Sequence, residues 1–384
     1  MSPDPHDRSP VDFADEAHAA GCPVVPAGDG TVIVVGHAEV RAAATDPETF
    51  SSAVSVHLQL PNGLDGEEHA AFRGLIDTYL AAPEVRRFTD GFHRVARQVV
   101  AEALEGDRPD AVVDLGATYA VRAMMVWLGW PRHLEERLLE WVRSNMAASR
   151  SGDRTRMAEV AGEFDALIAE VAEPRLSHPG DFNDVTSRLI QDEQLGRRLE
   201  FSEIVSILRN WTGGDLTSMA LCIGVICHGL AHDENLQGQL RSGPPEEEFE
   251  AVLDELLRLD SPFVANRRVT TCPVGIGGVE LPPGQRVRLH WTGANRDPDV
   301  FNGAFDPRGH AGENLVWGTG PHACPGRTLS MLELRAFVTE LLDAAVILPP
   351  PRNGRGTAAS VGSRNLHPNG GWARLPVRLL ARKP

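Results

Sequence analysis

Apolar positions repeat every three to four residues over long stretches of this chain, which is the period of a helix with one buried face. One stretch, 201–232, is the longest and most apolar, and it predicts a helix of roughly 45 Å that crosses the domain. The pattern therefore predicts a mostly helical protein. The other helical stretches are 67–88, 90–106, 113–128, 132–148, 154–172, 183–193, 245–260 and 327–345.

A second pattern occupies 263–291, where apolar and polar residues alternate between Gly-Gly and Pro-Pro-Gly turns. Such alternation is typical of short strands. The apolar run at 31–37 is also predicted to be a strand that ends in a turn, whereas 51–66 has no helical period and is predicted to be loop. Strands and helices are segregated and do not repeat as βαβ units. We therefore expect an α+β fold, mostly α, with a flexible lead at 1–22 and one domain over 23–384.

The composition indicates the cellular compartment and excludes some classes of partner. Apolar residues make up 42% of the 384 residues, and the formal net charge of -16 argues against nucleic acid and anionic membrane as partners. The N-terminus lacks a signal core, and we find no membrane-spanning stretch. The five cysteines are odd in number and widely spaced, so we expect a reducing, cytoplasmic setting without disulfides.

One of these cysteines, Cys324, lies in the glycine-rich segment WGTGPHACPGR directly before a helical stretch. Gly318 and Gly320 permit a positive φ and close approach to a flat ligand. The N–H groups at the helix start favour a thiolate, and Gly326 leaves room for a planar group. A cysteine simply buried in a turn is the alternative, but the combination of these features favours a metal ligand.

This segment resembles the haem-binding motif of the cytochrome P450 family, with Trp317 at the usual phenylalanine position. The resemblance covers about 24–380 and implies the family's triangular helical fold with a small strand-rich lobe. It also implies haem b as cofactor, Cys324 as its axial ligand and His322 as a propionate partner. A thiolate ligand favours O–O cleavage, so the implied activity is a monooxygenase that hydroxylates or oxidatively couples a small organic or natural-product substrate.

Further motifs follow in the family's order. His69 and Arg73, at i and i+4, match a pair that binds propionates, and Arg268 matches the arginine that the family places on a strand for the same purpose. Taken alone, the first pair would be interpreted as surface charges. The anionic propionates give one reason for cationic residues at separated places in the sequence.

Glu255 and Arg258, at i and i+3, share a helix face and can pair bidentately. They resemble the family's Glu-x-x-Arg pair, and the resemblance implies Arg308 as its third member. The expected role is structural, to support the fold around the cysteine loop.

The long stretch resembles the family's oxygen-binding helix, with Gly213, Gly214, Asp215 and Thr217 as the catalytic set. The family has an acid directly before the threonine, but Leu216 lies there, and Asp215 is displaced by about 100° around the helix. Thr217 could bond the Gly213 carbonyl oxygen, open a groove and steer protons. Two hypotheses remain: water or substrate groups deliver protons, or the chemistry, such as oxidative coupling or peroxide use, depends less on this relay.

The resemblance also implies ferredoxin and ferredoxin reductase as electron donors, docking near Arg327 and Arg335. The displaced acid keeps a second class of function open, a haem-binding protein or haem-dependent isomerase without oxygen insertion. Polar residues in the expected substrate segments predict a partly polar or large substrate, such as a peptide or natural-product scaffold. These segments are 51–66, 145–165, 209–217, 262–266 and 360–366.

Overall fold

The longest apolar stretch forms α10 (Phe201–Ala231), a helix of 31 residues at the centre of the molecule. Its N-terminus carries a capping box, in which Glu200 and Glu203 each bond the other's backbone N–H. Because α10 is apolar on most of its faces, it is buried between several neighbours. It packs against α6, α7, α8 and α12, and the prediction of a domain-crossing helix is confirmed.

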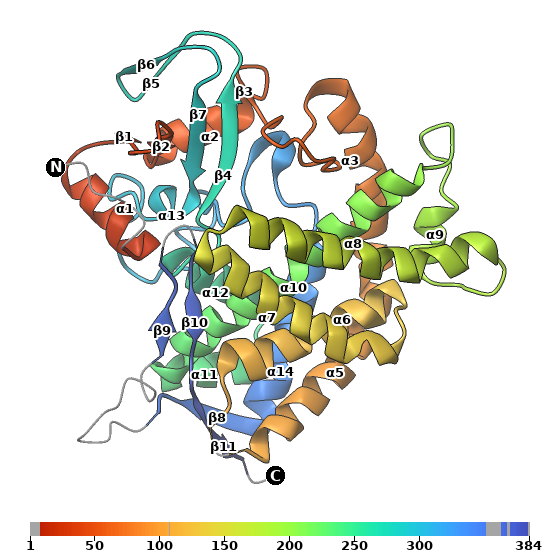
Figure 1. The fold of residues 1–384 in the computed structure, drawn as a ribbon. Coiled ribbons are helices and arrows are strands. Elements are labelled where there is room, and N and C mark those ends of the chain that lie inside the picture. Colours follow the sequence, from red (N-terminus) through yellow and green to blue (C-terminus); the bar gives the residue numbers. More distant parts are fainter. Residues whose placement is uncertain (1–7, 107, 351–361, 367–368, 383–384) are drawn as a thin grey trace.

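The structure is a computed structural model that describes residues 8–106, 108–350, 362–366 and 369–382. Helices make up most of the described chain, and a smaller strand-rich lobe lies at one corner (Figure 1). The α+β, mostly α fold class is confirmed. The main helices around α10 are α3 (Gly66–Leu80), α4 (Ala82–Val85), α5 (Thr89–Leu104), α6 (Thr118–Leu128), α7 (Glu135–Ser151), α8 (Arg154–Ser177), α9 (Val185–Ile190), α12 (Glu246–Leu259) and α14 (Arg327–Ala344).

One helix predicted from residue 113 begins instead as a π-helical segment, Ala111–Ala117, which continues into α6. Asp110 caps this segment by accepting bonds from the backbone N–H groups of Val112 and Val113. A Cβ atom at Gly116 would lie 2.7 Å from the carbonyl oxygen of Ala220, so only glycine permits this close approach to α10.

The lobe is built on a five-stranded sheet in the order β1-β2-β7-β4-β3. Strand β2 pairs parallel with β7, and β4 pairs antiparallel with β7, with Arg268 opposite Val287. A helix, α2 (His37–Thr45), packs against β7. The strands of this sheet are β1 (Val24–Pro26), β2 (Val32–Val34), β3 (Phe50–Ser51), β4 (Ala265–Thr270) and β7 (Arg286–His290).

Three two-stranded pairs complete the described strands, and each is antiparallel. One pair extends the lobe, and the other two bring the C-terminal segment back against the helical body (Figure 1). The pairs are β5 (Val274–Ile276) with β6 (Val279–Leu281), β8 (Ala345–Leu348) with β11 (Arg378–Ala381), and β9 (Ser363–Arg364) with β10 (Trp372–Arg374).

The described part of the lead at 1–22, which we expect to be flexible, contains a helix. Pro10–Ala19 forms α1, capped by Ser9, and buries Phe13 and Ala14. The helix packs against α13 (Trp291–Ala294) at the base of the lobe. Another short helix that the pattern did not predict, α11 (Glu234–Arg241), follows α10 after a cap at Asp233.

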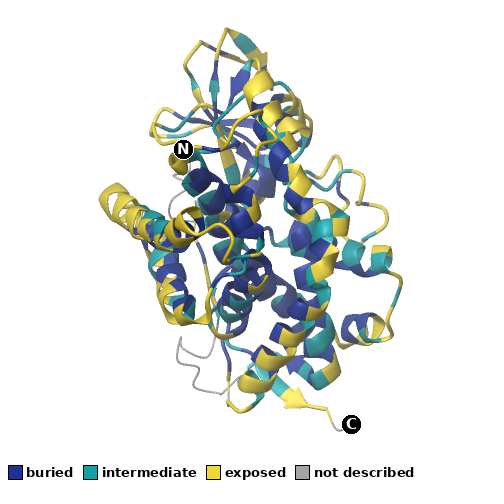
Figure 2. Cartoon of the chain, turned by 90° about the vertical axis from the view of Figure 1, so that its right-hand side faces the viewer, coloured by how far each residue is buried: buried dark blue, intermediate teal, exposed yellow. Residues whose placement is uncertain are grey.

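Buried positions concentrate in the interior helices and exposed positions on their outer faces (Figure 2). Two helical stretches, Ala111–Leu128 and Phe201–Ala231, are long and apolar enough to cross a membrane, although we predicted none from the sequence. Most of each stretch is buried against other parts of the fold, 72% and 61% respectively. Packing in the protein core accounts for their apolar composition.

Candidate active site

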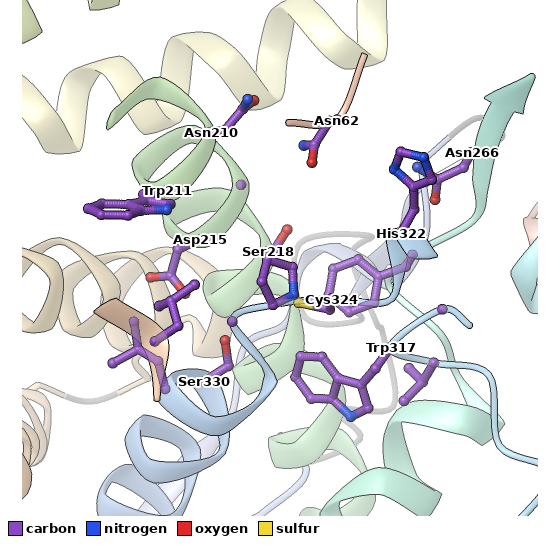
Figure 3. A pocket seen from close by; sticks show the side chains of 18 of the residues that line it. Asn62, Asn210, Trp211, Asp215, Ser218, Asn266, Trp317, His322, Cys324 and Ser330 are labelled. Carbon is purple, nitrogen blue, oxygen red and sulfur yellow. The ribbon is translucent and has the colours of Figure 1, made fainter. Parts of the chain in front are cut away.

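A cavity separates α10 from the segment 316–330 that contains Cys324 (Figure 3). It encloses about 1370 Å³ of space between protein atoms, its open mouth included. One wall is α10, and the opposite wall is the cysteine loop. The lining residues of the two walls include Gly214, Ser218, Met219 and Cys222 on α10 and Trp317, Gly318, Cys324, Pro325, Gly326 and Ser330 on the segment 316–330.

The cysteine loop takes the conformation that its glycines predicted. Gly318 and Gly320 have φ values of 71° and 72°, a region that favours glycine. A Cβ atom at Gly320 would lie 2.5 Å from the carbonyl oxygen of Ala44 on α2, so the loop packs tightly against that helix. The loop closes where the Cys324 N–H donates to the carbonyl oxygen of Trp317 at 2.8 Å, just before α14 begins.

The sulfur of Cys324 is subject to opposing influences. Burial raises the pKa of the thiol, whereas hydrogen bonds from the backbone N–H groups of Gly326 and Arg327 lower it. The helix start therefore donates to the sulfur as predicted. Burial outweighs these bonds, however, so the protein alone does not favour the thiolate, and a thiolate here requires a cation next to the sulfur.

Cationic and imidazole side chains gather at one end of the cavity. Arg268 is only 5% exposed; its guanidinium donates to the carbonyl oxygen of Arg267 at 2.8 Å and forms no ion pair within the described residues. The ring of His322 lies 4.1 Å from that of His69, centroid to centroid, and also contacts the Ser52 hydroxyl at 3.0 Å. Burial lowers the pKa of His322 to about 4 and also lowers that of His69.

These residues fit the haem group that the resemblance implies. A buried arginine without an anionic partner is costly, and a propionate would satisfy it. The Nε2 atom of His69 is also buried without a hydrogen-bond partner. Above Gly326, the nearest atoms to an added Cβ lie 3.8 Å away or more, so a planar group can lie against this wall.

Arg73 has a different position from the one we predicted. It does not line the cavity; its Nη1 atom donates to the carbonyl oxygens of Pro321 and Ala323 at 2.9 and 2.8 Å. Its Nε atom pairs with Asp77 at 2.7 Å. Arg73 therefore ties α3 to the cysteine loop, which is a positioning role.

The predicted pair of Glu255 and Arg258 is formed and buried, with each residue 1% exposed. The predicted third member, Arg308, is wrong: its side chain is 82% exposed and pairs with Glu248. His310 takes that place, with its Nδ1 atom 2.8 Å from a Glu255 oxygen. The loop that follows the strands turns Arg308 outward and His310 inward, which sequence spacing does not reveal.

The face of α10 that lines the cavity differs from the predicted one. Asn210, Gly214, Ser218 and Cys222, spaced four residues apart, all line it. Thr217 does not: its hydroxyl accepts a bond from the Asn145 amide on α7 at 3.1 Å.

Gly213 also faces away from the cavity, since an added Cβ would lie nearest to Trp141 and Phe164 on α7 and α8. The alcohol on this face of α10 is Ser218, which lines the cavity (Figure 3). We missed Ser218 from the sequence; its spacing of four residues from Gly214 is the signal that could have identified it.

Asp215 lines the cavity as well, on the side toward α14 (Figure 3). Burial raises its pKa to about 7, and a hydrogen bond with Ser330 opposes this shift. Glu333, one turn beyond Ser330, is fully buried, and burial together with the neighbouring Asp215 raises its pKa well above the usual range.

Three of the expected substrate segments reach the cavity. Loop 51–66 contributes Asn62, and Asn210 and Asn266 come from segments 209–217 and 262–266. Segment 145–165 contributes no lining residue. Of the last segment, 362–366 does not line the cavity, and residues 360 and 361 lie outside the described residues.

The two arginines expected to meet a partner protein are already paired within the chain. Arg327 contacts Asp254 at 2.9 Å, and Arg335 contacts Glu246 at 2.8 Å. Trp317 donates to the same Asp254 through Nε1 at 2.6 Å. The aspartate thus joins α12 to both ends of the cysteine loop.

Comparisons with known proteins agree with this geometry. The family model for cytochrome P450 matches residues 249–355. The chain is 27% identical over 325 residues to the cyclomarin C epoxidase CymV of Salinispora arenicola, covering 79% of this chain and 81% of that protein. It is 27% identical over 327 residues to the erythromycin C-12 hydroxylase of Saccharopolyspora erythraea, covering 80% of each.

A solved structure shares the fold. The open form of the cytochrome P450 Eryk from S. erythraea superposes with a TM-score of 0.85 at 24% identity, covering 99% of this chain and 98% of its own.

Proposed function

Because this chain belongs to the cytochrome P450 family, we propose that it is a cytoplasmic haem-thiolate monooxygenase that binds haem b through Cys324 and oxidises a small organic molecule with dioxygen. One observation carries the proposal: Cys324 and α10 line the same cavity, with Arg268, which forms no ion pair among the described residues, also in its lining. A thiol, a cavity and a buried cation together suit a porphyrin that carries carboxylates.

The bound haem would supply the redox chemistry that activates dioxygen, and a thiolate ligand favours O–O cleavage. Cys324 would provide the sulfur, steadied by N–H groups at the start of α14. Arg268, His322 and His69 would hold the propionates. Trp317, Gly318 and Gly326 would line the haem faces and keep water out.

On the opposite wall, Gly214 and Asp215 retain the roles expected of the oxygen-binding helix. Ser218 replaces Thr217 in our proposal, because only the Ser218 side chain lines the cavity. Its hydroxyl can both accept and donate a proton, so it can pass protons between water and the cavity.

We propose a polar, multifunctional natural product as substrate, which places the enzyme in secondary metabolism. The amide side chains of Asn62, Asn210 and Asn266 all line the cavity (Figure 3). The Asn210 amide donates to the carbonyl oxygen of Leu60, so its own oxygen remains available to a ligand. Two relatives are described as acting on cyclomarin C and erythromycin, which are compounds of this kind.

Ferredoxin and ferredoxin reductase are the electron donors that we propose, since no dinucleotide-binding motif is present. They would dock over the cysteine loop, where the path to the sulfur is short. Arg73 and Arg327 border this loop, and their ion pairs with Asp77 and Asp254 would exchange for acidic groups of the partner.

The test is the absorption spectrum of the reduced protein with carbon monoxide. We expect the red-shifted band of thiolate ligation in the wild type and in Cys272→Ser, whose cysteine is exposed and remote from the loop. Cys324→Ser should lose that band. A wild type without the band, or a Cys324→Ser protein that keeps it, would overturn the proposal. Screening metabolites for a change of haem spin state would then identify the substrate.

A further inference from the structure

Three aromatic side chains lie in ring contact between the cavity and Asp192, a partly exposed residue that follows α9. Trp127 and Trp211 both line the cavity, and their ring centroids are 5.1 Å apart (Figure 3 labels Trp211). The ring of Tyr79, on α3, follows at 5.5 Å from that of Trp211 and does not line the cavity. Both separations lie in the range of aromatic contact. The three rings therefore form one continuous chain that leads away from the cavity.

The outer end of this chain carries a proton acceptor. The Tyr79 hydroxyl donates to the Oδ2 atom of Asp192 at 2.6 Å, a length typical of a bond to a carboxylate. The other carboxylate oxygen accepts from the backbone N–H of Gln194 at 2.7 Å. Because Asp192 is partly exposed, a proton that it takes from Tyr79 can exchange with solvent.

The charges around Tyr79 decide how its ring can be oxidised. The guanidinium carbon of Arg188 lies 5.3 Å from the ring centroid, and Arg188 pairs with Glu84 at 2.7 Å. A cation at the ring disfavours a second positive charge there. Burial and the bond to Asp192 raise the pKa of Tyr79 well above its usual range, so the phenol keeps its proton at rest. An electron therefore leaves this ring together with the proton.

The sequence contains one other tyrosine, Tyr119, and its surroundings differ. Its hydroxyl donates to the backbone carbonyl oxygen of Glu333 at 2.8 Å, and a carbonyl does not take up a proton near neutral pH. Its ring packs against Phe337 at 5.1 Å, and neither of these two residues lines the cavity. Tyr79 alone of the two tyrosines joins a ring path from the cavity to a carboxylate.

We propose that Trp211, Tyr79 and Asp192 form a relay that delivers single electrons to an oxidant in the cavity. Trp211 gives up one electron and regains it from Tyr79, whose O–H bond breaks as the proton passes to Asp192. Tyr79 is then a neutral radical, and Asp192 is protonated. A soluble thiol returns one electron to Tyr79 and loses its own proton to solvent, while Asp192 returns the phenolic proton.

The oxidant is hydrogen peroxide, which forms when dioxygen takes up two electrons and two protons without oxidising a substrate. Two passages through the relay supply two electrons, and solvent supplies two protons, so that peroxide becomes two water molecules and two thiols become a disulfide. This inference rests on the proposed function, which brings dioxygen and electrons to the cavity. Met219 and Cys222 line the cavity as well, and both residue types are readily oxidised. The relay would consume peroxide before it damages them.

The first measurement does not depend on haem. A light flash on a ruthenium polypyridyl complex with a sacrificial electron acceptor generates a soluble one-electron oxidant. We expect the absorption of a tyrosyl radical in the wild type and in Tyr119→Phe, and its loss in Tyr79→Phe. Asp192→Asn keeps an acceptor oxygen but takes no proton, so the radical should form about tenfold more slowly or less. Equal radical yields in the wild type and Tyr79→Phe would overturn the proposal.

The second measurement tests the connection to the cavity. Haem-loaded protein that contains ring-deuterated tyrosine is mixed with hydrogen peroxide and frozen, and electron paramagnetic resonance identifies the radical. We expect a tyrosyl signal in the wild type that both Tyr79→Phe and Trp211→Phe remove. The matched control is Trp141→Phe, since Trp141 stacks on Phe164 and does not line the cavity. A tyrosyl signal that survives Trp211→Phe, or an equal loss in Trp141→Phe, would refute the relay.

The two proposals can fail separately, because the carbon monoxide band is recorded on the same preparation. If this band is present and peroxide gives no tyrosyl signal, the relay is refuted and the proposed function stands. If the band is absent, the proposed function is refuted, and the flash experiment alone decides whether Tyr79 loses an electron together with a proton to Asp192.

Discussion

Glu255 holds Arg258 by two hydrogen bonds of 2.7 and 2.8 Å in the interior beneath the cysteine loop. Arg258 also donates to the carbonyl oxygen of Asn295, and Glu255 accepts from the backbone N–H of Asp306. The pair thus fixes two loop segments to α12. Hydrogen bonds to Arg258, His310 and Asp306 lower the pKa of Glu255 against the effect of burial, so it stays ionised.

Glu255→Ala should therefore destabilise the protein strongly, because it leaves Arg258 as an unpaired buried charge. We expect a loss of about 3–5 kcal/mol in the free energy of unfolding. Arg308→Ala, which removes the exposed residue first predicted for this cluster, should change it by about 0.5 kcal/mol or less. Urea unfolding of both variants checks this, and a larger loss in Arg308→Ala would contradict the assignment of His310.

Ser218→Ala should reduce product formed per reductant consumed by about tenfold or more, because a positioned proton-transfer group is lost. Thr217→Ala should leave this ratio within about twofold of the wild type, since its hydroxyl bonds to Asn145 on α7. The measurement follows reductant and product together. The reverse order of the two variants would restore Thr217 to the proton path.

Arg268→Ala should weaken haem retention, because a charge-assisted bond to a propionate is worth about 1.5–3 kcal/mol. That corresponds to roughly ten- to a hundredfold faster loss of haem. Arg267→Ala is the matched control, since Arg267 is exposed on the same strand. Transfer of haem to an excess of a haem-scavenging protein measures the rate, and equal rates in both variants would exclude Arg268 as an anchor.

The buried carboxyl group of Asp215 predicts how stability depends on pH. The folded-state pKa of Asp215 is raised from 3.8 to about 7, so its contribution is complete below pH 3.8 and is lost as the pH rises through about 7. Asp215→Asn should therefore gain thermal stability over the wild type as the pH rises across this window. Thermal unfolding midpoints measured from pH 4 to pH 8 check this.

Glu340→Gln serves as a control of opposite sign. Hydrogen bonds from Arg97 and His93 lower the pKa of Glu340 below 4.5, against the effect of burial. Its stabilising effect is present above that pH and is lost as the pH falls. The variant should be less stable than the wild type at neutral pH, and the difference should shrink in acid. The same trend in Asp215→Asn would show that Asp215 is ionised in the folded state.

Local patterns were sufficient for much of the fold and part of the site. The apolar period predicted α10, because a long stretch that is apolar on nearly all faces forms a buried helix. The glycines around Cys324 predicted the loop conformation, since glycine, which has no Cβ atom, adopts a positive φ readily wherever it lies in the fold. The short helix α1 was missed because what fixes it is burial of Phe13 at α13, a contact between residues far apart in sequence.

The remaining errors concern which way side chains point. A motif frame that differs by one residue on a helix selects a different face, which is why Thr217 was chosen and Ser218 was not. Arg308 and His310 are two residues apart in a loop, and only the packing around Glu255 decides which of them turns inward. The sequence identifies these residues, but tertiary contacts determine the direction in which each side chain points.

The four-residue spacing along α10 limits how this enzyme can change its selectivity. Positions 210, 214, 218 and 222 line the cavity beside a second row at 211, 215 and 219, and Trp211, Met219 and Cys222 also belong to the apolar core. Combinatorial libraries that vary position 210 together with the loop around Asn62 should yield altered preferences in folded proteins. Randomising the adjacent faces would mostly yield insoluble chains, so the route to new substrates is narrow and can be mapped in advance.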